Sequence, residues 1–178
     1  MENNINNINS NKFKVFFETF GCKVNYAETS RMLDEFTKNG TIATDKVEES
    51  DILVVNTCSV TKKADADARK AIRHALRANP KIYIIVTGCA AEINPFQFSA
   101  IPGVDLVVGN TGKFNILDYA DGFHKNLESI IIDPKIENLQ FDFAYSSEAD
   151  SRTRAVLKIQ DGCEYNCTYC VIPQARGK

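Results

Sequence analysis

Ile52-Leu-Val-Val-Asn-Thr-Cys58 joins a run of aliphatic residues directly to a cysteine. The apolar residues follow one another without alternation, which is typical of a parallel strand buried on both faces of a sheet. Residues 52–56 are therefore predicted to form such a strand, with Cys58 in the loop at its carboxyl end. The same arrangement, an apolar run followed within a few residues by a cysteine, occurs twice more along the chain.

Other apolar runs of the same kind alternate with segments of helical periodicity. Further strands are predicted over residues 14–18, 82–87, 104–108 and, more weakly, 129–132. Helices are predicted over residues 26–38, 62–78 and 113–120. This alternation predicts an α/β fold, an open parallel sheet with helices on both faces. At the start of the first helix, Asn25 is expected to act as a cap, with Glu28 reaching back to it.

The chain of 178 residues divides by composition into four parts. Residues 1–11 are rich in asparagine and lack the basic start and apolar core of a signal peptide, so a disordered leader is expected there. The α/β domain should occupy residues 12–132, and the polar stretch 133–154 is interpreted as a linker. Residues 155–178 begin with a new strand over 155–160 and continue into a run of cysteines.

Composition and charge exclude some classes of function. The content of hydrophobic residues is 44% and that of charged residues 25%, as in an ordinary globular protein, and the formal charge of −2 gives no general nucleic-acid footprint. No run of about 18 apolar residues occurs, so no membrane span is expected and a cytoplasmic location is favoured. Residues 151–178 hold five basic and two acidic residues. That excess suits a phosphate-bearing partner, although a solvated basic tail gives the same count.

Three cysteines far apart in the sequence are predicted to meet. Cys22, Cys58 and Cys89 each follow one of the first three predicted strands, which are 14–18, 52–56 and 82–87. In an open parallel sheet the carboxyl ends of the strands form one edge, where ligands collect. Gly21 and Gly88 precede two of these cysteines and allow tight turns and a close approach of the backbone to a bulky group. The alternative is that each cysteine is a small hydrophobic residue beside a strand.

The other three cysteines lie in one short segment. It reads Asp161-Gly-Cys163-Glu-Tyr-Asn-Cys167-Thr-Tyr-Cys170. Three thiolates at this spacing are one ligand short of a closed four-cysteine iron–sulfur site, which would leave one iron open to a small molecule. Zinc is the main alternative, but structural zinc sites use four ligands, and the two histidines, His74 and His124, fall in predicted helical or surface segments. Free thiols also remain open, whereas disulfides are disfavoured in a cytosolic chain.

A further motif is less informative. Gly109-Asn-Thr-Gly112-Lys113 is similar to a phosphate-binding loop, but the Walker spacing between the glycines is missing. We interpret it as the turn that caps the third predicted helix.

The cysteine motifs together resemble one known family. The run from Cys163 to Cys170, with an aromatic residue before the last cysteine, resembles the radical S-adenosylmethionine signature. The three earlier motifs resemble those of the amino-terminal domain of methylthiotransferases: Phe20-Gly-Cys22-Lys-Val-Asn25, Val55-Asn-Thr-Cys58-Ser-Val-Thr61 and Val86-Thr-Gly-Cys89. The flanks 152–163 and 172–177 are similar as well, so the likeness covers nearly the whole chain from residue 12.

Three branches of that family differ beside the cysteines. The segments around Cys22 and Cys58 look most like the branch that acts on threonylcarbamoyladenosine in tRNA. The branch acting on isopentenyladenosine usually has Gln-Met in place of Lys23-Val24, and the branch acting on a ribosomal-protein aspartate usually has Pro-Lys there. A zinc-binding nucleic-acid-interaction module is the alternative of another class.

The resemblance implies a cofactor set and a reaction. It implies a [4Fe–4S] cluster on Cys163, Cys167 and Cys170 that binds S-adenosylmethionine, with Tyr169 beside that cofactor. It implies a second, auxiliary [4Fe–4S] cluster on Cys22, Cys58 and Cys89. The implied reaction is radical methylthiolation of C2 of the modified adenosine at tRNA position 37, which requires a tRNA substrate and an electron-donor protein. Residues 155–178 would be the first strand and cluster loop of a truncated α/β radical barrel, so the chain alone is expected to be inactive.

Overall fold

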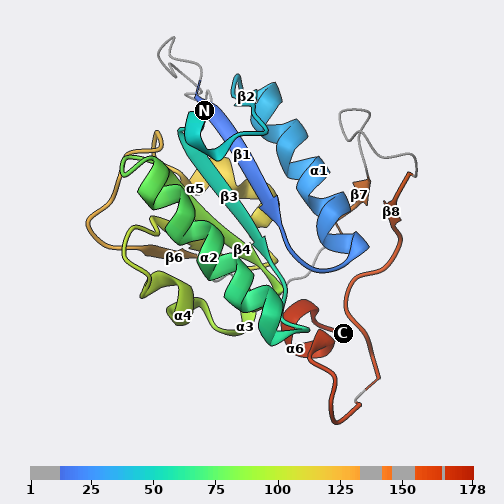
Figure 1. Cartoon of the computed structure of the whole chain (residues 1–178). Coiled ribbons are helices and arrows are strands. Elements are labelled where there is room, and N and C mark those ends of the chain that lie inside the picture. Colours follow the sequence, from blue (N-terminus) through green and yellow to red (C-terminus); the bar gives the residue numbers. More distant parts are fainter. Residues whose placement is uncertain (1–12, 133–141, 146–154, 166) are drawn as a thin grey trace, which may run out of the picture.

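The computed structural model describes residues 13–132, 142–145, 155–165 and 167–178. An open sheet of six strands forms its centre, and all neighbouring strands in it are parallel (Figure 1). The strands are β1 (Lys14–Thr19), β2 (Ile42–Ala43), β3 (Ile52–Thr57), β4 (Tyr83–Gly88), β5 (Leu106–Val108) and β6 (Ile130–Ile132). Their order across the sheet is β2-β1-β3-β4-β5-β6. The predicted α/β class with an open parallel sheet is therefore confirmed.

Helices cover both faces of this sheet. The helices among the described residues are α1 (Lys23–Lys38), α2 (Lys62–Ala78), α3 (Cys89–Ile93), α4 (Pro95–Ser99), α5 (Ile116–Tyr119) and α6 (Ile172–Arg176), with 3₁₀ turns η1 (Val47–Glu49) and η2 (Lys113–Asn115). No helix among the described residues is long and apolar enough to span a membrane. The helix α2 has the predicted bounds, because Thr61 caps its amino end by accepting a hydrogen bond from the Ala64 N–H, and Asn79 ends it before Pro80.

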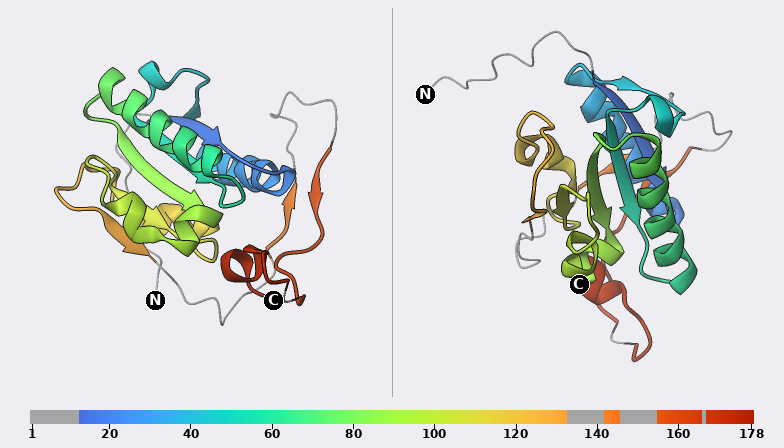
Figure 2. Two further views of the ribbon diagram at one scale, coloured as in Figure 1. Left: turned by 60° about the horizontal axis from the view of Figure 1, so that its bottom comes forward. Right: turned by 60° about the vertical axis from the view of Figure 1, so that its left-hand side comes forward.

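Two hydrophobic cores lie on the two faces, and alternate residues of β3 enter each. Leu53 and Val55 pack with Ile72 of α2 in one core. Ile52 and Val54 belong to the other core, with residues of α1 and α5. The sheet thus lies between α2 on one side and α5 on the other (Figure 2, right). Burial of the strands on both faces explains why their sequences are apolar without alternation.

The predicted cap of the first helix is wrong. The helix α1 begins at Lys23, with Cys22 as its N-cap residue and no side-chain cap hydrogen bond. Asn25 and Glu28 are instead fully buried and bind partners elsewhere in the chain. The third predicted helix is split into η2 and α5, while α3, α4 and the two-residue strand β2 were not predicted.

The segment after β6 differs from the expected start of a barrel. The strand predicted over 155–160 is reduced to β8 (Leu157–Lys158), which pairs antiparallel with β7 (Ala144–Tyr145) in a separate sheet. A barrel strand is not seen among the described residues. The predicted leader and most of the predicted linker lie outside the described residues.

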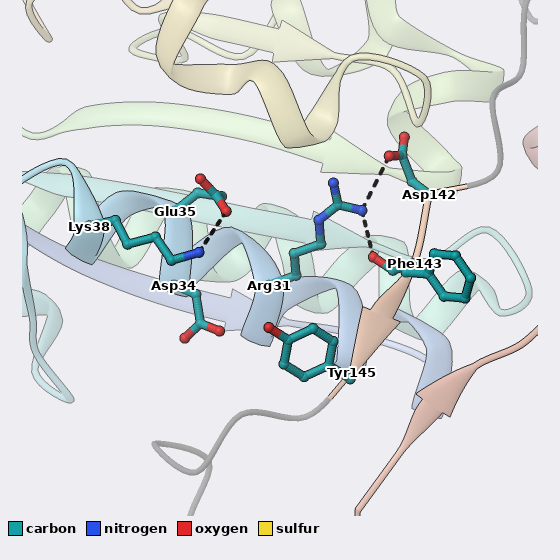
Figure 3. A pocket seen from close by; sticks show the side chains of 7 residues that line it. All are labelled: Arg31, Asp34, Glu35, Lys38, Asp142, Phe143 and Tyr145. Carbon is teal, nitrogen blue, oxygen red and sulfur yellow. Dashed lines mark hydrogen bonds and ion pairs between the residues drawn. The ribbon is translucent and has the colours of Figure 1, made fainter.

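A shallow pocket of about 210 Å³ separates α1 from the segment that contains β7. Across it, Arg31 of α1 donates hydrogen bonds to the carboxylate of Asp142 and to the Phe143 carbonyl (Figure 3). Glu35 and Lys38 pair with each other on the same side of the helix. The contacts of Arg31 hold the segment of β7, and with it β8, against the sheet domain.

Candidate metal centre at the carboxyl edge of the sheet

The chain reverses its direction across the sheet between β1 and β3. From β1 it passes through α1 to β2 on one side, whereas β3, β4, β5 and β6 follow one another on the other side. Because α1 and α2 lie on opposite faces, a crevice opens at the carboxyl ends of β1 and β3, where open α/β sheets bind ligands. A pocket of about 390 Å³ lies there. It is lined by Phe20, Gly21, Cys22, Cys58, Val60, Thr61, Lys63, Ala64 and Asp67.

The structure places the first three cysteines at the ends of three adjacent strands. Cys22 follows β1 and is exposed. Cys58 and Cys89 follow Thr57 and Gly88, which are directly paired in β3 and β4, and both cysteines are buried. The three therefore share one edge of the sheet, as the strand pattern predicts.

Two glycines let these loops approach one another. Gly21 has φ +104°, and a Cβ there would lie 2.6 Å from both Cβ and Sγ of Cys58. Gly88 has φ +95°, and a Cβ there would lie 2.5 Å from the Thr57 carbonyl oxygen. Both positions therefore require glycine, for conformation and for space.

Buried hydrogen bonds hold the three loops together. The Asn25 amide donates to the carbonyls of Phe20 (2.8 Å) and Thr57 (3.0 Å), which joins the Cys22 loop to the Cys58 loop. The Thr57 hydroxyl donates to the Thr87 carbonyl (2.6 Å) and accepts from the Ala91 N–H (3.2 Å). These bonds join the Cys58 loop to the segment around Cys89.

The donor set suits thiolate ligation, although the ligands are not preformed. Burial raises the pKa of the Cys58 thiol, and the nearby thiols of Cys89 and Cys22 act in the same direction, because each opposes a second negative charge. A metal removes this penalty by replacing the proton. Within the described part of the chain, no three Cys, His, Asp or Glu side chains already converge as ligands, so the thiols would have to turn toward a common centre. Both histidines are exposed, as expected, and neither lines the pocket.

The second triad lies in a loop on the surface. Cys163 and Cys170 are half-buried and Cys167 is exposed. The Cys163 N–H donates to the Gly177 carbonyl (3.1 Å) and the Cys170 N–H donates to the Cys167 carbonyl (3.0 Å). Tyr169 is exposed as well.

A group of buried charges beside the cysteines was missed by the sequence analysis. The Glu28 carboxylate accepts from Lys113 Nζ (2.7 Å), from Lys158 Nζ (3.0 Å) and from both terminal nitrogens of Arg176 (2.8 and 2.9 Å). Asp161 pairs with Lys158 and Arg176. These five residues are called the Glu28 cluster below. Burial acts to raise the pKa of Glu28, but the three cations together hold it far below its usual range.

The Glu28 cluster joins segments from four parts of the sequence. Glu28 lies on α1, Lys113 on η2, Lys158 on β8 and Arg176 on α6. Arg176 also donates from Nε to Cys89 Sγ at 3.2 Å. The cluster thus fixes α6, which follows the second cysteine triad, against the edge of the sheet that carries the first triad (Figure 1).

The glycine motif at residues 109–113 is part of the same arrangement. Lys113 is buried, pairing with Glu28 and donating to the Asn110 side chain at 3.0 Å. Asn110 in turn donates to the Ala175 carbonyl (2.5 Å). The η2 turn does begin at this motif, but with no side-chain cap. Its lysine therefore serves a buried ion pair, which the interpretation as a simple capping turn did not foresee.

Comparison with known proteins agrees with this arrangement. Residues 14–109 match the family described as uncharacterised protein family UPF0004. The chain is 42% identical over 168 residues to the threonylcarbamoyladenosine tRNA methylthiotransferase MtaB of Bacillus subtilis, covering 92% of this chain and 36% of that protein. It is 38% identical to the protein of the same name from Aquifex aeolicus, covering 93% and 40%. It is 30% identical to the tRNA-2-methylthio-N(6)-dimethylallyladenosine synthase of Aquifex aeolicus, covering 93% and 39%.

The match to UPF0004 covers more than half of the chain. The chain therefore belongs to this family, which forms the amino-terminal domain of methylthiotransferases. It spans about two-fifths of the length of these relatives.

Proposed function

We propose that this chain is the amino-terminal part of a radical S-adenosylmethionine methylthiotransferase acting on C2 of threonylcarbamoyladenosine at tRNA position 37. The observation that carries the proposal is the position of the two cysteine triads. One lies at the carboxyl edge of the sheet, and the other is followed by a helix that the Glu28 cluster fixes to that edge. Relatives at 42% and 38% identity bear the name of this activity.

Each triad would hold a [4Fe–4S] cluster. One cluster would be held by the three thiolates of Cys163, Cys167 and Cys170. The auxiliary cluster would be held by those of Cys22, Cys58 and Cys89, so each cluster would keep one iron without a protein ligand. When bound, the two clusters supply the reductive cleavage of S-adenosylmethionine and an open iron for delivery of sulfur. Tyr169 would lie beside the cofactor.

The chain's own residues shape and shield the auxiliary site. Gly21 and Gly88 leave room for two of the cysteine loops, and Asn25 ties two loops together. Two of the three cysteines, Cys58 and Cys89, are buried, which limits their contact with water. Such shielding limits side reactions of a reactive centre.

The partners follow from the proposed reaction. A tRNA substrate and an electron-donor protein are required, and the reaction belongs in the cytoplasm. Two of the five basic residues after position 150, Lys158 and Arg176, are buried in ion pairs, so they do not support a phosphate-binding role for this segment. Because the chain spans about two-fifths of the length of relatives that bear the name of a tRNA-modifying enzyme, we propose that tRNA is bound through other parts of a longer protein.

The substrate is tested by deleting the gene and analysing tRNA nucleosides by mass spectrometry. We expect loss of the methylthio form of threonylcarbamoyladenosine and accumulation of threonylcarbamoyladenosine itself. Reintroduction of the intact gene should restore the methylthio form. Loss of the methylthio form of isopentenyladenosine instead would assign the protein to the second branch. An unchanged nucleoside pool would contradict a tRNA substrate and point to a ribosomal-protein aspartate.

A further inference from the structure

Arg176 joins the Glu28 cluster to a candidate cluster ligand. Its Nη1 donates to Glu28 and Asp161, and its Nη2 donates to Glu28 and Asn25. Its Nε donates to Cys89 Sγ at 3.2 Å. All three nitrogens of the guanidinium therefore have partners, and its planar shape fixes the direction of each bond.

This guanidinium is buried and cannot exchange its partners for water. Arg176 is 6% exposed and Cys89 is 5% exposed. A cation at such a site is retained only where it is paired and hydrogen-bonded. Within the ion pairs of the Glu28 cluster, three cations face two carboxylates. A further buried carboxylate, that of Glu92 in α3, accepts a hydrogen bond from the Asn110 backbone N–H.

A thiolate at Cys89 would be a further partner of this guanidinium. It would offer a negative charge to the side of the guanidinium that bears Nε, where the structure places the sulfur. Hydrogen bonds and positive charge at a ligand sulfur stabilise the reduced, more negative state of an iron–sulfur cluster, because they offset the added electron. The contact between Arg176 and Cys89 would therefore affect the electron affinity of the bound cluster as well as the orientation of the Cys89 ligand.

We propose that Arg176 is a positioning residue that orients Cys89 as a ligand and raises the reduction potential of the cluster held by Cys22, Cys58 and Cys89. The proposal rests on the proposed function, because it requires that cluster. It also gives the segment after the second triad a direct influence on the first, since the Gly177 carbonyl beside Arg176 accepts the Cys163 N–H.

The test uses the full chain with Cys163, Cys167 and Cys170 replaced by Ala, so that only the first triad can hold iron. The parent, Arg176→Lys and Arg176→Met are reconstituted anaerobically with iron and sulfide. Iron content is measured, the fold is checked by circular dichroism, and the reduction potential is measured by titration followed by electron paramagnetic resonance. Arg31→Met is the matched control, because Arg31 also pairs with a carboxylate but belongs to the pocket between α1 and β7.

We expect Arg176→Met to favour the oxidised cluster by at least tenfold, a potential lower by about 59 mV for one electron. Arg176→Lys keeps the charge but loses the planar guanidinium with its fixed hydrogen-bond directions, so its shift in potential should be smaller. Arg31→Met should have the potential and iron content of the parent. Loss of iron from a folded Arg176→Met chain would also support the positioning role. A folded Arg176→Met chain with the iron content and potential of the parent would overturn the inference alone. A parent that binds no iron–sulfur cluster would overturn the proposed auxiliary site and the inference together.

Discussion

Glu28 illustrates how one side chain can hold distant segments together. Its carboxylate is fully buried and binds cations that follow it by 85, 130 and 148 positions. A buried carboxylate without partners would be strongly disfavoured, so the three cations are a condition of its burial. Removal of the carboxylate would take from Lys113, Lys158 and Arg176 the buried partner that they share.

Glu28→Gln should lower the free energy of unfolding by about 3–5 kcal/mol, because it breaks a buried ion pair and leaves the opposite charges in place. Urea denaturation followed by circular dichroism measures this change. Glu35→Gln is the control on the same helix, since Glu35 forms an exposed pair with Lys38 and should matter by less than about 1 kcal/mol. Equal effects of the two substitutions would show that the Glu28 cluster adds no stability.

Because of the same carboxylate, we expect the folded chain to lose stability in acid. The pKa of Glu28 is lowered on folding from its ordinary value of 4.5, so below that value the unfolded chain takes up the proton first. The contribution of Glu28 is therefore complete above pH 4.5 and declines as the pH falls below it. The relevant comparison is the stability gap between wild type and Glu28→Gln from pH 7 to pH 3. A gap that stays constant over this range would contradict the assignment. The groups facing Glu28 are Lys113, Lys158 and Arg176.

At the scale of the elements, the approach of β3 and β4 near the cysteines depends on Gly88. Its φ of +95° and the crowding by Thr57 leave no room for a side chain. Gly40, after α1, has a similar φ of +92°, but a Cβ at that position would have no other atom within 4 Å. Substitution of the two glycines in turn therefore separates the free-energy cost of the backbone conformation from that of close packing.

Gly88→Ala should destabilise the chain by more than Gly40→Ala, for which about 1–3 kcal/mol of backbone strain is the whole expected cost. The excess comes from overlap with the β3 backbone, which cannot move aside as a flexible side chain could. Thermal unfolding of the two variants under the same conditions measures the difference. Equal melting temperatures would mean that the approach of the two strands is not tight.

The elements that were predicted correctly have strong local signals. The buried strands are continuous aliphatic runs, and α2 has a capping threonine and an Asn-Pro stop. The carboxyl-edge position of Cys22, Cys58 and Cys89 follows from those strands. In contrast, α3 and α4 have five residues each, too short for helical periodicity to be recognised in the sequence.

At the scale of the whole molecule, the Glu28 cluster could not be predicted, because its ion pairs join segments that are far apart in the sequence. Asn25 and Glu28 have the residue types and spacing of a helix cap, so a cap accounted for both residues without any partner elsewhere in the chain. Their actual partners come from segments that only the folded chain brings together. The usable signal was a carboxylate on the inward face of a helix, together with the lysine of the glycine motif that follows β5.

The Glu28 cluster should also control the docking of the segment after the second triad. In Glu28→Gln, we expect faster amide hydrogen exchange in α6 and at Gly177, because Arg176 loses its ion pair with Glu28, while exchange in β3 and β4 stays slow. Mass spectrometry of peptic fragments resolves these regions. Unchanged protection of α6 would show that other contacts dock the segment.

The central claim is that Cys22, Cys58 and Cys89 together hold an iron–sulfur cluster. It is tested most directly by iron and sulfide analysis of the chain that lacks Cys163, Cys167 and Cys170, after anaerobic reconstitution. The account predicts about four iron atoms per chain, as in one [4Fe–4S] cluster, and their loss when Cys58 is also replaced by Ala. Binding of zinc in place of iron, or an iron content that does not depend on Cys58, would contradict it.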